Sequence, residues 1–187
     1  MPTLETERLL VRPFVMDDLD ACHQLLDHEA WQTGKTIEER RRWLQWAELS
    51  YEVLADLHQP PYGDRAVVLK STGALVGSVG FVPSMGFFDR LPSCGGDEDC
   101  ELTRPEAGLF WATRAADLNR GYATEAARAL VDWLFGTFSL RRIVATTTYD
   151  NLASQAVMRH LGMSVEHNPR EDPPWFQVVG VLQNTRL

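Results

Sequence analysis

Long apolar runs are absent from this chain of 187 residues. None approaches the roughly 18 residues that a membrane-spanning helix requires, so we expect no membrane partner. The first residues also lack the basic stretch followed by an apolar core that is typical of a signal peptide. Hydrophobic residues make up 44% of the chain and charged residues 24%, and these values are typical of a globular protein in water.

Cysteine and positive charge are both scarce. The three cysteines, Cys22, Cys94 and Cys100, are too few for a disulfide framework, so we expect a reducing, cytoplasmic compartment. Lys and Arg number 18 against 26 Asp and Glu, which gives a net charge of −8. So acidic a chain is a poor match for nucleic acid, and we predict no such partner. The charge is compatible with a cationic small substrate or a basic peptide, although solubility explains it better.

Familiar nucleotide and metal motifs are missing as well. The chain contains neither G-x-G-x-x-G nor the P-loop pattern. The irregular stretch from Pro83 to Arg104 combines Cys94 and Cys100 with the acidic cluster Asp97–Glu101, but the spacing matches no zinc pattern and no histidine is near. We therefore predict no metal site and interpret the stretch as an exposed loop. Its carboxylates could steer a cationic substrate or form a solvated surface.

Strand and helix patterns alternate along the chain without an internal repeat. Apolar runs predict strands over residues 9–13, 66–70, 75–82, 106–113, 142–149, 164–166 and 175–182. Helical periodicity begins at Met16, after a capping box at Thr36, at Tyr122, and after the cap residue Asn151. This order predicts a mixed α+β fold in a single domain over residues 1–187.

The second predicted helix carries an apolar pattern, which predicts burial, and a charged pattern, which predicts exposure to solvent. An apolar stripe predicts a face buried in the core, with a border to a substrate cleft as the alternative; its members are Trp43, Trp46, Ala47, Val53, Leu54 and Leu57. The basic run Arg40–Arg42 follows Glu38 and Glu39, so we interpret it as a solvated face rather than a nucleic-acid contact.

The stretch Glu106–Thr124 carries the clearest functional signal. It predicts a strand, a polar connection from Arg114 to Asn119, and a helix start. The free N–H groups of a first helical turn and the helix dipole attract anions. Gly121 permits close approach of a ligand, and Arg120 adds a positive charge. Taken alone, an ordinary strand-to-helix connection explains the pattern equally well.

A second strand-to-helix junction runs from Thr148 to Ser154. Strand–helix–strand units are right-handed with parallel strands, so we expect both junctions at the same edge of the sheet. Ligands bind at that edge, beyond the carboxyl ends of the strands. Asn151 and Ser154 are three residues apart and lie close to one face of a helix. The two junctions together favour a ligand site.

Four segments of the chain together resemble the GNAT acyl-CoA N-acyltransferase superfamily. The resemblance is to the branch that contains the ribosomal-protein N-terminal acetyltransferases and many small-molecule N-acetyltransferases. The segments are Leu4–Phe14 (LETERLLVRPF), Glu106–Trp111 (EAGLFW), Asn119–Ala126 (NRGYATEA) and Asn151–Met163 (NLASQAVMRHLGM). They span nearly the whole chain in the family's order, which makes the combination specific. The resemblance implies a three-layer α/β/α fold with splayed central strands.

The resemblance also implies acetyl-CoA as the cosubstrate. Its pantetheine arm would pair with the strand backbone around Trp111, Ala112 and Thr113, and Asn151 matches a position that contacts this arm. The residues implied to hold the pyrophosphate through their amides are Asn119, Arg120, Gly121, Tyr122, Ala123 and Thr124. Leu118 departs from the family's phosphate motif, which has Gln or Arg at this position.

The implied reaction is direct transfer of the acetyl group to a primary amine of a small molecule or a protein N-terminus. Ser154 matches the position proposed in this branch to protonate the departing thiolate; the alternative is a hydroxyl bonded to its own backbone. Glu106 matches an often acidic position and is the candidate base, acting directly or through a water, or else a structural carboxylate. Met158 stands where many relatives carry a Tyr general acid.

Three questions stay open at this point. The missing tyrosine leaves a non-catalytic CoA-binding or sensory module on the same fold as the alternative function. The residues do not indicate which amine accepts the acetyl group, or whether acyl groups longer than acetyl are used. A monomer and a homodimer are both compatible with the sequence.

Overall fold

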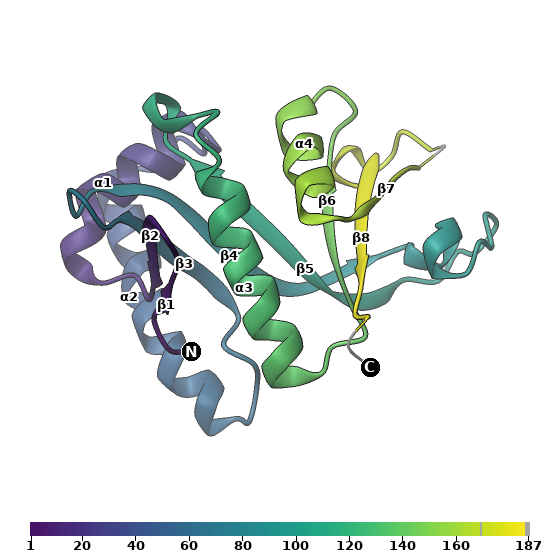
Figure 1. The fold of residues 1–187 in the computed structure, drawn as a ribbon, viewed down its shortest axis with the longest axis horizontal. Helices are drawn as coiled ribbons and strands as arrows, with labels where there is room; N and C mark the ends of the chain where they lie inside the picture. The colour runs from purple at the N-terminus through teal and green to yellow at the C-terminus, as the bar shows by residue number, and fades with distance from the viewer. Residues whose placement is uncertain (169, 186–187) are drawn as a thin grey trace. The chain divides into compact units, whose positions relative to one another are not determined.

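The computed structural model describes residues 1–168 and 170–185 (Figure 1). The described strands are β1 Leu4–Glu5, β2 Leu9–Arg12, β3 Gly63–Leu69, β4 Leu75–Gly86, β5 Arg104–Thr113, β6 Arg142–Thr147, β7 Ser164–His167 and β8 Val178–Gln183. The described α-helices are α1 Leu19–His23, α2 Ile37–Asp56, α3 Tyr122–Phe138 and α4 Leu152–Leu161. This composition confirms the predicted mixed α+β fold. None of the described helices is long and apolar enough to cross a membrane.

The strands form one mixed sheet with the hydrogen-bonded order β1-β2-β3-β4-β5-β6-β8-β7. β5 and β6 run parallel, as the intervening helix α3 requires, and they pair through Ala107 with Ile143 and Gly108 with Val144. The pairs on either side, β2 with β3, β3 with β4, β6 with β8 and β7 with β8, are antiparallel. The predicted parallel strand–helix–strand unit is therefore confirmed.

The chain divides into two compact units. The first contains Met1–Phe81 and Trp111–Leu130, and the second contains Val82–Phe110 and Val131–Leu187. Neither unit is a continuous stretch, because β4, β5 and α3 each begin in one unit and end in the other. No linker separates them in sequence, and the single domain over residues 1–187 stays a prediction.

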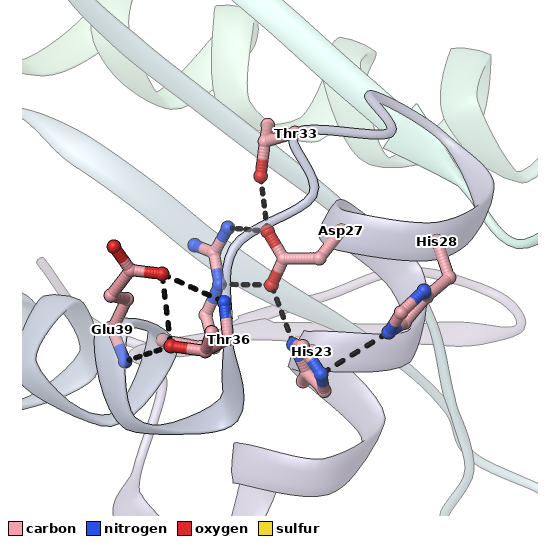
Figure 2. Close-up of polar contacts among 7 residues, drawn as sticks. His23, Asp27, His28, Thr33, Thr36 and Glu39 are labelled. Atoms are coloured by element: carbon pink, nitrogen blue, oxygen red, sulfur yellow. Dashed lines mark hydrogen bonds and ion pairs between the residues drawn. The ribbon is translucent and has the colours of Figure 1, made fainter.

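The core of the first unit lies between α1 and α2 and the strands β2 and β3. Its buried members are Phe14, Leu19, Cys22, Leu25, Leu26, Leu44, Ala66, Val68, Leu75 and Ala112. The predicted capping box starts α2: Thr36 Oγ1 accepts the Glu39 N–H at 3.3 Å, and the Glu39 carboxylate accepts the Thr36 N–H at 2.8 Å (Figure 2). Burial raises the pKa of the Cys22 thiol to about 12, and all three cysteines are free.

In the second unit α4 lies beside β6, β7 and β8 (Figure 1). Asn151 caps this helix, because its Oδ1 accepts the Ser154 N–H at 3.0 Å, and Gly162 ends it with a φ of 88°. Both ends of α4 are therefore confirmed. Close packing against β8 depends on Gly180, where a Cβ would come within 2.7 Å of the Met163 sulfur and 3.0 Å of Met158. Met158 is fully buried in this contact.

Of two predictions about the helical N-terminal region, one is right only in part and the other is wrong. The helix expected from Met16 begins there, but it starts as a 3₁₀ turn over Met16–Asp18, continues as α1 and ends as a π-helical turn over Gln24–Glu29. The buried face of α2 also differs from the predicted one. Trp46, Val53 and Leu57 are exposed, whereas Arg40, expected in solvent, is buried. Arg40 is buried because it donates two hydrogen bonds to the buried Asp27 carboxylate, a partner 13 positions away.

The stretch from Pro83 to Arg104 is only partly the exposed loop that we predicted. β4 continues to Gly86, and Phe88 and Leu91 are almost fully buried in the core of the second unit. Short 3₁₀ turns at Phe88–Arg90 and Pro92–Cys94 bring these apolar side chains inward. The carboxylates of Asp97–Glu101 are exposed as expected.

Candidate functional site

The predicted anion-binding turn lies between β5 and α3 in the first unit. After β5 the chain makes a 3₁₀ turn over Ala115–Asp117, and Leu118 to Gly121 are exposed. Asn119 and Gly121 both have left-handed backbones, with φ of 60° and 78°. α3 starts directly afterwards at Tyr122, and the first amides of a helix have no acceptor within the helix. The turn therefore exposes backbone donors at a helix N-terminus, which is an arrangement suited to a phosphate.

A buried carboxylate fixes the 3₁₀ turn in front of this helix start. Asp117 is 4% exposed and accepts a hydrogen bond from Arg114 Nε at 2.7 Å, while its other oxygen lies 3.5 Å from Arg120 Nη1. Arg120 itself is mostly exposed, with 57% of its side chain in solvent. The pairing holds the backbone of the turn and leaves the Arg120 guanidinium able to face a ligand.

The N-terminal segment contributes a clamp that the sequence analysis did not identify. We call this group of three residues the Arg8–Glu125 clamp; its members are Thr6 and Arg8 of the N-terminal segment and Glu125 of α3. The Glu125 carboxylate accepts hydrogen bonds from the Thr6 hydroxyl at 2.5 Å, the Arg8 N–H at 2.9 Å and Arg8 Nε at 2.7 Å. Burial acts to raise the pKa of Glu125, but these bonds outweigh it and hold the pKa below its ordinary value.

Arg8 also contacts the anion-binding turn directly. Its Nη1 donates to the Arg120 carbonyl oxygen at 3.0 Å, and its guanidinium carbon lies 4.7 Å from the centre of the Tyr122 ring. A Cβ on Gly121 would lie 3.5 Å from Arg8 Nη2. The turn is thus bordered by two arginines, and one of them, Arg8, lies just before β2, more than a hundred residues earlier in the chain. The only sequence signal for it is that Arg8 and Glu125 both belong to segments that resemble the same family.

The residues predicted to align the pantetheine arm lie at the end of β5, in the same unit as the turn. Ala112 is buried, and Trp111 and Thr113 are half-buried. β4 and β5 approach so closely here that a Cβ on Gly77 would lie 2.5 Å from the Ala112 carbonyl oxygen. The first unit therefore contains two of the three parts of the chain that the resemblance assigns to the cofactor.

The remaining predicted residues, Asn151, Ser154 and Glu106, belong to the second unit. Asn151 uses its side-chain oxygen to cap α4. The half-buried Ser154 hydroxyl makes no hydrogen bond within residues 1–168 and 170–185, so the alternative of a bond to its own backbone does not occur there. Glu106 Oε1 lies 2.8 Å from Arg142 Nε and 3.1 Å from Arg104 Nε. These ion pairs favour the structural reading of Glu106 over that of a free base.

Comparison with known proteins agrees with the resemblance. The sequence profile described as "Acetyltransferase (GNAT) domain" matches residues 8–164. An uncharacterized N-acetyltransferase YnaD of Bacillus subtilis is 39% identical over 167 residues, covering 87% of this chain and 83% of YnaD.

Solved structures share the fold. An acetyltransferase from Agrobacterium tumefaciens superposes with a TM-score of 0.69 and 26% identity, covering 98% of this chain and 95% of that one. RimL, a ribosomal L7/L12 α-N-protein acetyltransferase solved in complex with coenzyme A, superposes with a TM-score of 0.64 and 16% identity, covering 98% of this chain and 97% of RimL.

The Arg8–Glu125 clamp predicts a pH-dependent contribution to stability. Glu125→Gln should lower the free energy of unfolding by about 1 kcal/mol at neutral pH, because Arg8 is 42% exposed and its ion pair is screened. Since the folded-state pKa of Glu125 is lowered, this contribution is present above the ordinary carboxyl pKa and is lost as the pH falls through the folded-state value. Urea unfolding at about pH 7 and pH 3.5 measures the difference.

The matched control is Glu38→Gln, which removes an exposed carboxylate 3.6 Å from Arg41 on α2 and should change stability very little. A Glu125→Gln effect that is equally large at both pH values would contradict the clamp.

Proposed function

The chain belongs to the GNAT acetyltransferase family, and we propose that it transfers the acetyl group of acetyl-CoA to a primary amine. The observation that carries the proposal is the turn at Asn119–Thr124, with its left-handed backbone, its position at the start of α3 and its two bordering arginines. The pyrophosphate of coenzyme A carries one negative charge on each phosphorus, shared between its non-bridging oxygens, and matches such a turn. RimL, a protein with this fold, is solved with coenzyme A.

We assign the pyrophosphate to the amides of Asn119, Arg120, Gly121, Tyr122, Ala123 and Thr124. The β5 backbone around Trp111, Ala112 and Thr113 would pair with the pantetheine arm, and Asn151 would contact that arm from α4. The pairs between β5 and β6 are Ala107–Ile143 and Gly108–Val144, near the start of β5.

The proposed chemistry is attack of a neutral amine on the thioester carbonyl. The amine must first lose a proton, since an ammonium has no lone pair, and a tetrahedral intermediate then expels the thiolate. Peptide N–H groups of β5 would stabilise the oxyanion of that intermediate. The Ser154 hydroxyl, which is half-buried and free of backbone bonds among the described residues, is suited to give its proton to the thiolate. Met158 cannot serve as an acid, because it has no ionisable proton and is fully buried.

The acceptor is proposed only as a class. The name of RimL points to protein N-termini, and small-molecule amines fit the family equally well. A homodimer and a cytoplasmic location stay predictions. The experiment that tests the function is an acceptor screen with acetyl-CoA, in which free thiol is measured. Acetyl-CoA binding without thiol release from any amine of a broad panel would instead support the non-catalytic module.

Gly121→Glu tests the position of the pyrophosphate. The new side chain would enter the turn with a negative charge and force a left-handed backbone on a residue with a Cβ, so we expect acetyl-CoA binding to be lost. Calorimetry at up to millimolar acetyl-CoA measures it. The control is Gly73→Glu, which adds the same charge at a φ of 70° in an exposed turn with no atom within 4 Å of the new Cβ. Tight binding by Gly121→Glu would refute the assignment.

Ser154→Ala tests the proposed general acid. Loss of the proton donor should lower kcat about 100-fold, while the dissociation constant of acetyl-CoA stays within about threefold. Thiol release and calorimetry measure the two quantities. Ser164→Ala, which removes an exposed hydroxyl from β7, is the control and should retain full activity. An unchanged kcat for Ser154→Ala would exclude this role.

Glu106→Gln separates the two roles considered for this carboxylate. Because Arg142 is only 7% exposed, loss of the negative charge should lower the free energy of unfolding by about 3 kcal/mol. The kcat of the folded variant should fall less than tenfold. Glu38→Gln, whose carboxylate is 67% exposed beside the 44% exposed Arg41, should leave stability nearly unchanged. A kcat loss of 100-fold or more with normal stability would identify Glu106 as the base instead.

A further inference from the structure

A polar cluster in the first unit is not used by the proposed reaction. Its centre is the Asp27 carboxylate, which is fully buried and accepts hydrogen bonds from Arg40 at 2.6 and 2.8 Å and from the Thr33 hydroxyl (Figure 2). His23 Nδ1 lies 2.8 Å from Asp27 Oδ2, and His23 Nε2 lies 3.1 Å from His28 Nε2. The three side chains therefore form a row. The buried Asp27 carboxylate contacts the His23 imidazole, and His23 contacts the exposed His28 imidazole.

The backbone explains why these two histidines meet. Residues five apart are on different sides of an α-helix, which has 3.6 residues per turn. The chain from Gln24 to Glu29 is a π-helical turn instead, and the Ala30 N–H donates to the Leu25 carbonyl oxygen, five residues back, at 2.8 Å. In this wider turn the His23 and His28 rings meet edge to face, and Figure 2 shows the contact between them as a dashed line. Single π-helical turns are found frequently at functional sites.

The Asp27 bond determines which nitrogen of His23 is available. A neutral imidazole that donates Nδ1–H to a carboxylate keeps its lone pair on Nε2, the atom that faces His28. Histidines that bind metals are oriented by carboxylates in the same way. Asp27 is itself held by the buried guanidinium of Arg40, so buried residues determine the orientation of the His23 ring. His28 is exposed, which leaves room for water or another ligand.

The distance between the two nitrogens also suits a shared ion. If each Nε2 lies about 2.05 Å from one ion, a separation of 3.1 Å corresponds to an angle of roughly 98° at the ion. That value lies between about 90° for octahedral and about 109° for tetrahedral coordination. The ring centroids are 4.6 Å apart with planes at 77°, so the rings do not stack face to face.

We propose that His23 and His28 bind one borderline divalent cation of the zinc, nickel and copper class through their Nε2 atoms, with Asp27 as the carboxylate that orients His23. Water completes the coordination, because no group of three or more His, Cys, Asp and Glu side chains among the described residues could hold a metal. The site is independent of the proposed transferase function, and it departs from the expectation of a chain without metal. Imidazole pairs select these ions over magnesium.

The test is calorimetry of the full chain, free of any affinity tag, with zinc chloride and separately with magnesium chloride. We expect one zinc per chain, a higher Tm at saturating zinc, and no heat with magnesium. His28→Ala should weaken zinc binding at least about tenfold, and since His28 is exposed the variant should keep its fold. His28→Cys should restore binding, because a thiolate also binds zinc.

His58→Ala is the matched control, since it removes another exposed histidine, after the end of α2, and should bind zinc as the unchanged chain does. Absence of zinc binding at millimolar concentration would overturn the proposal. Unchanged binding by His28→Ala would also overturn it and would place the ion elsewhere, for example at the acidic residues Asp97–Glu101.

Discussion

The position of the anion-binding turn depends on the ion pair between Arg8 and Glu125. Glu125 lies in the first turn of α3, and Arg8 precedes β2, so their contact connects the start of the helix to the N-terminal strands. Arg8 extends past this pair to the Arg120 carbonyl oxygen and the Tyr122 ring. A turn with two left-handed residues is costly to hold in one conformation. The clamp and the buried Asp117 fix both of its sides, so a ligand would meet donors already in place.

Asp27 plays an equivalent part between the π-helical turn and α2. Burial of its carboxylate acts to raise the pKa, but hydrogen bonds from Arg40, Thr33 and His23 reverse the effect and keep it ionised. Two buried charges that satisfy each other stabilise a fold only modestly, yet removal of either leaves the other without a partner. The pair therefore specifies how α2 meets the π-helical turn at Gln24–Glu29, and the direction of His23 follows from it.

Local signals in the sequence were sufficient for parts of this structure. The bounds of α3, the Thr36 capping box and the Asn151 and Gly162 ends of α4 each depend on residues within one helical turn. The features that could not be predicted depend on distant partners. Arg40 is buried because Asp27 is present, Arg8 reaches Glu125 across 117 positions, and Glu106 meets Arg142 across 36. Periodicity alone predicts that a charged residue is exposed, because the pattern takes no account of a partner elsewhere in the chain.

The same limit applies to the chemistry of Glu106. Its family position suggested a base, but a base that takes a proton from an ammonium loses its charge. Glu106 would then leave Arg142, almost fully buried, without a counter-charge, at a cost of about 3–5 kcal/mol. A water molecule that takes the proton and releases it to solvent avoids this cost. The contacts of Glu106 thus favour a carboxylate that holds β5 against β6, and the mechanism that we propose assigns the proton of the amine to water.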